Sequence, residues 1–105
     1  MERIARLMIP VSLLGATSQA AEVGDPAKGV AIANDVCSRC HAIRKGQLPS
    51  PNLMAPTFVQ IAGTPGMTAI ALNATLTTPH AEMPMFMLSS EQREDIIAYI
   101  FSLRN

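Results

Sequence analysis

The stretch that decides the fold is Cys37-Ser38-Arg39-Cys40-His41, which holds both cysteines of the chain. The two thiols stand three positions apart and a histidine follows directly, a spacing typical of covalent c-type haem attachment. At the end of a helix, thiols at this separation can reach the two vinyl groups of one haem, and the histidine then lies next to the iron. The spacing therefore predicts one haem, held by Cys37 and Cys40 and ligated by His41.

Three other uses of a cysteine pair remain as alternatives. A thioredoxin-like redox pair belongs beside a βαβ pattern, which this sequence lacks. A structural zinc ion needs four ligands, and the chain offers only the two cysteines, His41 and His80. A plain local disulfide is the third alternative.

The composition favours an all-α fold, because alanine, leucine, isoleucine and methionine dominate and no long run of alternating β-branched residues occurs. We predict three to five helices packed around one covalently attached haem. The predicted helices cover residues 26–36, 57–62, 68–76 and 89–104.

The first and last of these helices carry the clearest signals. Asp25 is a good N-cap and Pro26 suits the first helical position. Gly29 costs roughly 1 kcal/mol of helix propensity relative to alanine, which predicts a packing reason for it. Ser89 and Gln92 have the spacing of a capping box at the start of the last helix.

The N-terminus has the pattern of a cleaved secretory signal peptide over residues 1–20. Arg3 and Arg6 precede an apolar stretch, residues 7–16, and Ser18-Gln19-Ala20 places small residues at a cleavage site. A membrane anchor needs about 20 apolar residues, more than this stretch supplies. We therefore expect residues 21–105 to form the mature monohaem domain, located in the periplasm.

The mature chain is nearly neutral and small. Cleavage removes two of the eight basic and one of the eight acidic residues, which leaves a net charge near −1. This charge argues against nucleic acid as a partner, because phosphate binding needs a clustered basic surface. A chain of this size with four aromatic residues builds a poor core alone, and a large apolar cofactor would supply the missing part.

The chain resembles the class I cytochrome c family in its short bacterial form. The resemblance rests on five features that stand in the expected order over nearly all of residues 24–104. They are Gly29, the haem motif, Ala55-Pro56-Thr57-Phe58, Met83-Pro84 and Asp95-Ile96-Ile97-Ala98-Tyr99-Ile100.

The resemblance implies two further site residues. In this family the haem histidine donates its outer N–H to a proline carbonyl, for which Pro56 is the best match and Pro51 the alternative. A thioether normally fills the sixth position on the iron and raises the reduction potential. Met83 matches that ligand, with Met85 and His80 as alternatives.

The implied function is electron transfer by a periplasmic carrier that is not itself an enzyme. Its partners would be redox proteins, and it would be peripheral to the membrane at most. Arg39, Arg44 and Lys45 cluster in sequence around the attachment site and could form a docking patch for an acidic partner. The alternatives are a gas-binding or sensor cytochrome, and an electron-transfer subunit of a periplasmic dehydrogenase.

Overall fold

The computed structural model describes residues 10, 23–79, 83–84 and 87–104; nearly all of the predicted signal peptide, together with His80 and Met85, lies outside them. The described part contains four α-helices and confirms the predicted all-α fold. They are α1 (Pro26–Val36), α2 (Phe58–Ala62), α3 (Ala69–Thr77) and α4 (Ser90–Ser102).

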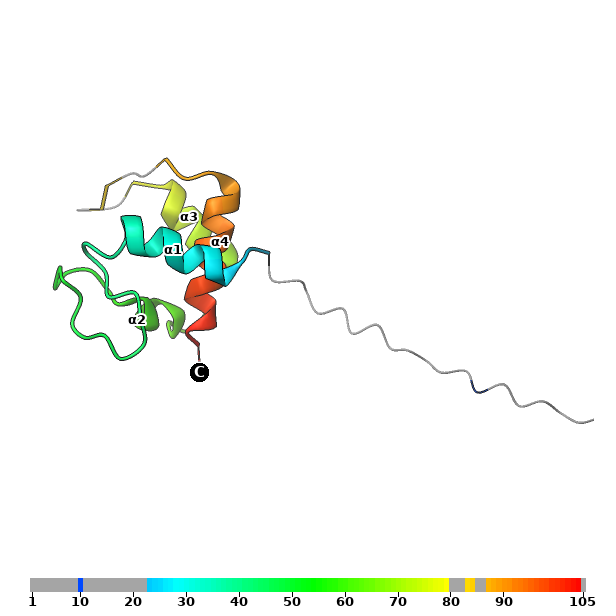
Figure 1. Ribbon diagram of the computed structural model, residues 1–105, viewed down its shortest axis with the longest axis horizontal. Coiled ribbons are helices and arrows are strands. Elements are labelled where there is room, and N and C mark those ends of the chain that lie inside the picture. The colour runs from blue at the N-terminus through cyan, green and yellow to red at the C-terminus, as the bar shows by residue number, and fades with distance from the viewer. Residues whose placement is uncertain (1–9, 11–22, 80–82, 85–86, 105) are drawn as a thin grey trace, which may run out of the picture.

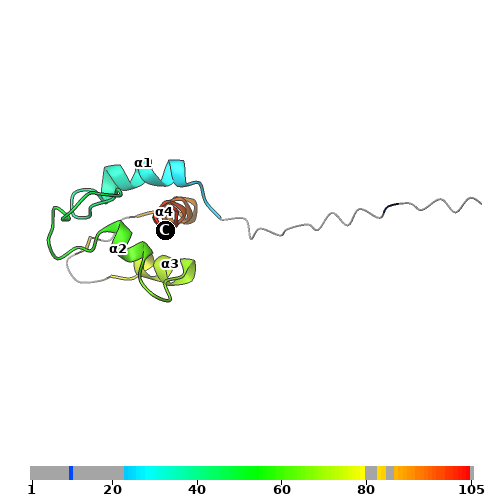
Figure 2. The ribbon, with the colours of Figure 1, turned by 90° about the horizontal axis from the view of Figure 1, so that it is seen from below.

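Helix α4 is the centre of the fold. It packs against each of the other three helices. Figure 2 shows α1 on one side of α4 and both α2 and α3 on the other, whereas Figure 1 shows α1 crossing α4. The most deeply buried large side chains are Ile43, from the segment after α1, and Ile96 of α4.

The helix starts follow from local capping. The Asp25 carboxylate accepts a hydrogen bond from the Ala27 N–H, 2.9 Å away, and Pro26 opens α1 as predicted. Ser89 and Gln92 form the predicted capping box, with each side chain bonded to the other residue's backbone N–H. Helices α2 and α3 begin one residue later than predicted, because Thr57 and Thr68 are their N-caps.

Gly29 has the packing role that its presence in a helix predicts. A Cβ at this position would lie 1.9 Å from the Asp95 carbonyl oxygen of α4, so only glycine permits this helix approach. Gly24, at a positive φ of 105°, makes a second close approach to the Glu94 carbonyl just before α1. The two glycines let α1 lie directly against the backbone of α4.

Gly29→Ala is expected to destabilise the folded protein by roughly 3 kcal/mol, since overpacking a rigid contact outweighs the gain in helix propensity. Unfolding by guanidinium chloride, with haem bound, measures the effect. Gly63→Ala is the matched control, because the nearest atom to its added Cβ would be 3.3 Å away. Equal stability of the Gly29 variant and the wild type would contradict the close-approach interpretation.

Within the part of the chain that the structure describes, no helix has both the length and the apolar character that crossing a membrane requires.

Candidate functional site

The two cysteines and His41 lie in the turn that follows α1. Cys37 is the C-cap of the helix, and its carbonyl oxygen accepts hydrogen bonds from the Cys40 N–H at 3.2 Å and the His41 N–H at 2.9 Å. This turn holds the three side chains close together. Both thiols are free, so the structure contains no local disulfide between them. Before haem is attached, burial raises the pKa of the Cys37 thiol to about 11.

All three side chains line a cavity of about 480 Å³. The cavity is bounded by all four helices and by the segment that contains Met83 and Pro84. Most of its other walls are apolar side chains: Val36, Phe58, Ile61, Met67, Leu72, Leu76, Ile96 and Ile100. Its volume and apolar lining suit a large, mostly apolar ligand.

The donor set of the cavity fits haem. Two thiols three positions apart can form the covalent attachment, and an imidazole and a thioether are ligands that hold haem iron. Cys37, Cys40, His41 and Met83 supply these four groups to one cavity. Among the described residues, no group of three or more His, Cys, Asp or Glu side chains could hold a metal ion, as a zinc site would require.

His41 is oriented by the segment before α2. Its Nδ1 lies 2.6 Å from the Pro56 carbonyl oxygen. Because a carbonyl can only accept, Nδ1 carries the proton in this contact and Nε2 keeps its lone pair for a metal. The ring also contacts Phe58, with centroids 5.5 Å apart. The carbonyl that His41 reaches thus belongs to Pro56, while the alternative Pro51 is an exposed loop residue.

Met83 is half-buried and lines the cavity together with Pro84. By contrast, Met87 is 99% exposed and is not part of the lining. The end of this segment is held by Arg93, which donates to the Leu88 carbonyl at 2.7 Å and to the Asn73 side chain at 2.9 Å. The Arg93 guanidinium therefore connects the segment after Met83 to both α3 and α4.

Sequence reasoning missed two long-range polar contacts beside the site. The Tyr99 hydroxyl of α4 donates to the Ile43 carbonyl, two residues after His41, at 2.5 Å. Burial raises the pKa of Tyr99, and Arg44 partly opposes this, so the hydroxyl remains a donor at neutral pH. The one available signal was general: a buried tyrosine hydroxyl usually finds a partner, but the sequence does not say which.

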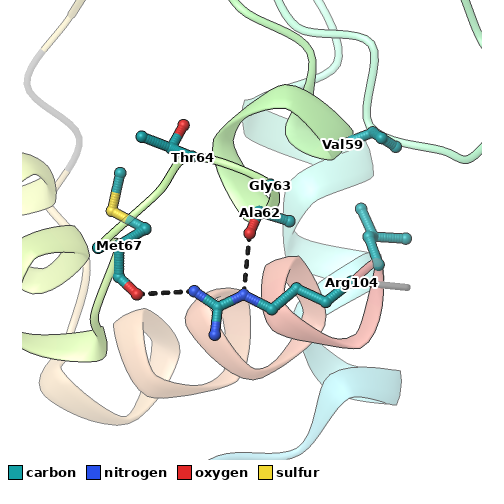
Figure 3. Close-up of a pocket in the computed structure, with 8 residues that line it drawn as sticks. Val59, Ala62, Gly63, Thr64, Met67 and Arg104 are labelled. Carbon is teal, nitrogen blue, oxygen red and sulfur yellow. Dashed lines mark hydrogen bonds between the residues drawn. The ribbon is translucent and has the colours of Figure 1, made fainter.

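The second contact involves Arg104, which lies just past the C-cap of α4 (Figure 3). Its guanidinium donates to the Ala62 carbonyl at 2.8 Å and to the Met67 carbonyl at 2.7 Å. It also lies over the Phe101 ring, 4.0 Å from the centroid. These contacts border a second cavity of about 520 Å³, and none of its lining residues is a cysteine or histidine. Arg104 thus links the end of α4 to the connection between α2 and α3.

Comparison with known proteins agrees with this geometry. Residues 24–100 match the family model described as cytochrome C oxidase, cbb3-type, subunit III. The chain is also 34% identical over 94 residues to cytochrome c-552 of Bradyrhizobium diazoefficiens. The matched stretch covers 90% of this chain and 89% of that protein. The chain belongs to the cytochrome c family. No solved structure gives a significant match to this cytochrome.

Membership confirms the predicted cofactor and the general function. The cytochrome is an electron-transfer haem protein, and its haem c is covalently bound. The motif of Cys37, Cys40 and His41 has the spacing that such attachment requires.

Proposed function

We propose that the chain is an exported, periplasmic carrier of single electrons, with haem attached through Cys37 and Cys40 and ligated by His41 and Met83. The observation that carries the proposal is that these four side chains line the same, mostly apolar cavity. When bound, haem supplies an iron that alternates between the ferrous and ferric states. If His41 and Met83 both held the iron, no position on it would be left for a substrate, which would fit a carrier better than an enzyme.

The protein's own residues would hold the iron ligands in one geometry in both oxidation states. The Pro56 carbonyl fixes the orientation and tautomer of the His41 ring and raises its basicity as a ligand. Pro84 biases Met83 toward an extended backbone, which lowers the entropy that the methionine loses when it binds. A coordination shell that changes little on reduction supports rapid electron transfer.

We also propose that the partner docks at the mouth of the cavity, where Arg39 and Met54 belong to the lining. Leu53 and Met54 are 79% and 82% exposed, and Arg44 and Lys45 are also exposed. Residues 37–79 contain these three basic residues and no acidic one. An exposed methionine beside an arginine at the mouth, on a segment with basic but no acidic residues, fits a redox partner with an acidic docking surface.

An experiment on the docking surface compares charge reversal with a remote change. Arg44→Glu with Lys45→Glu is expected to slow electron exchange with an acidic redox partner by about tenfold at low ionic strength, because electrostatic steering is lost. The difference should disappear at high salt. Lys28→Glu, an exposed change on α1, is the matched control. An equal effect of the control would rule out this patch as the docking site.

Export makes a separate prediction. Mass spectrometry of native periplasmic material should find an N-terminus at or near Ala21 and the added mass of one haem. The expected mass follows from cleavage after Ala20, with the small residues Ser18 and Ala20 at the −3 and −1 positions. An intact Met1 in that material would contradict both the predicted signal peptide and the predicted start of the mature chain at Ala21.

Two other functions would use the same site. A gas-binding or sensor cytochrome would have a displaceable sixth ligand, so its ferrous form would bind carbon monoxide readily at neutral pH. An electron-transfer subunit of a larger enzyme, a dehydrogenase for example, would co-purify with the catalytic chain. Absorption spectra of the purified protein, oxidised and reduced, with and without carbon monoxide, separate the carrier from the sensor.

A further inference from the structure

The two residues that follow His41 are held by hydrogen bonds to residues further along the chain. The Ala42 N–H donates to the Ser50 hydroxyl at 3.0 Å, and the Ala42 carbonyl accepts from the Phe58 N–H at 2.9 Å. The Tyr99 hydroxyl donates to the Ile43 carbonyl at 2.5 Å. The Ile43 N–H donates to the Gln47 side chain at 3.2 Å. Outside helices, buried backbone groups usually need such partners. Two of the partners here are side-chain hydroxyls, those of Ser50 and Tyr99.

This arrangement is buried. Ala42 is 0% exposed and Ile43 is 2% exposed, while Ser50 and Tyr99 are 4% and 8% exposed. In such surroundings water competes little for the hydrogen bonds, and loss of one partner leaves a polar backbone group without compensation. The position of the Ala42–Ile43 backbone therefore depends in part on these two hydroxyls.

The held backbone is directly connected to His41. Phe58 donates its N–H to Ala42 and also packs its ring against the imidazole. The Phe58 ring in turn packs against Tyr99, with centroids 6.3 Å apart. A shift of the Ala42–Ile43 backbone would thus move both the His41 imidazole and the Phe58 ring that packs against it.

We propose that Ser50 and Tyr99 are positioning residues for His41, whose hydroxyls hold the backbone after it and thereby set how the imidazole meets the iron. The inference rests on the proposed ligation of iron by His41. It assigns roles to two side chains that do not belong to the cavity lining. A loosely held imidazole would donate less electron density to the iron. Because ferric iron needs that density more than ferrous iron does, loosening His41 should favour the reduced protein.

The test removes each hydroxyl from the haem-bound protein. Tyr99→Phe keeps the ring and Ser50→Ala keeps the small size, while Ser50→Thr restores a hydroxyl. Ser102→Ala is the matched control, because the Ser102 hydroxyl donates within α4 to the Tyr99 carbonyl and does not touch the His41 segment. The readouts are the paramagnetically shifted proton resonances of the His41 ring and the ratio of reduced to oxidised protein at a fixed potential.

We expect Tyr99→Phe and Ser50→Ala each to move the His41 resonances. Each should also raise the reduced-to-oxidised ratio, by at most about tenfold, because only the part of a buried hydrogen bond's free energy that differs between the two oxidation states contributes. Ser50→Thr should recover most of the change, and Ser102→Ala should show none. Unchanged resonances and ratio in Tyr99→Phe and Ser50→Ala, even with lowered stability, would overturn the proposal. If Ser50→Ala does not fold, Tyr99→Phe decides. A wild-type spectrum without an axial histidine would instead refute the proposed function.

Discussion

Replacing Cys37 and Cys40 together by alanine is expected to leave a largely unfolded chain without haem. The reason is that the haem cavity lies within the core: Phe58, Leu72 and Ile96 line it and also belong to the main buried cluster. Without haem, the cavity of about 480 Å³ would stay unfilled and its apolar lining would face water. A small domain has little stability to spare, so the loss of this part of the core is expected to unfold it.

The measurement is the far-ultraviolet circular dichroism of the purified variant, together with its haem absorbance. Ser38→Ala is the matched control, because it changes the residue beside Cys37 and keeps both thiols. The Ser38 hydroxyl makes an exposed hydrogen bond to the Asn34 carbonyl, so its loss should cost little. A helical and cooperatively unfolding double variant without haem would show that the cofactor is not needed for the core.

Met83→Ala is expected to open the sixth position on the iron. The weak near-infrared band from sulfur-to-iron charge transfer should vanish, and the ferrous protein should bind carbon monoxide readily. Electron transfer should slow, because an iron with a vacant or water-occupied position reorganises more on reduction. The basis is that Met83 lines the cavity and is followed by Pro84, which stiffens the segment.

Two neighbouring methionines serve as controls. Met87→Ala should keep the band, because that side chain is 99% exposed and lies outside the cavity lining. Met85→Ala should also keep it and change stability only modestly. If Met83→Ala retains the band and Met85→Ala loses it, the ligand lies two residues further along the chain.

Much of the fold could be predicted because its signals are local. The Ser89–Gln92 capping box and the Asp25–Pro26 start are written in a few adjacent residues, and the structure confirms both. Gly29 was predicted to have a packing reason, since glycine is costly in a helix. Its partner, the Asp95 carbonyl oxygen, could not be named from the sequence.

The long-range polar contacts could not be predicted. Tyr99 bonds to Ile43 across 56 positions, and Arg104 bonds to Ala62 across 42. Arg104 stands just after the last helix, where a cation is favoured, but its guanidinium bonds to carbonyls outside that helix. Such partners depend on how the helices pack, and no periodicity or spacing encodes them. The haem motif, by contrast, could be predicted, because the two cysteines and the histidine lie within five consecutive residues, 37–41.

The most direct test of the central claim is the absorption spectrum of the purified, mature protein in its oxidised and reduced forms, before and after extraction with acidified acetone. We predict a sharp α band on reduction, a sulfur-to-iron near-infrared band on oxidation, and haem that stays with the polypeptide after extraction. Haem that leaves in the solvent would contradict attachment through Cys37 and Cys40. Absence of the near-infrared band in the oxidised protein would contradict ligation by a methionine.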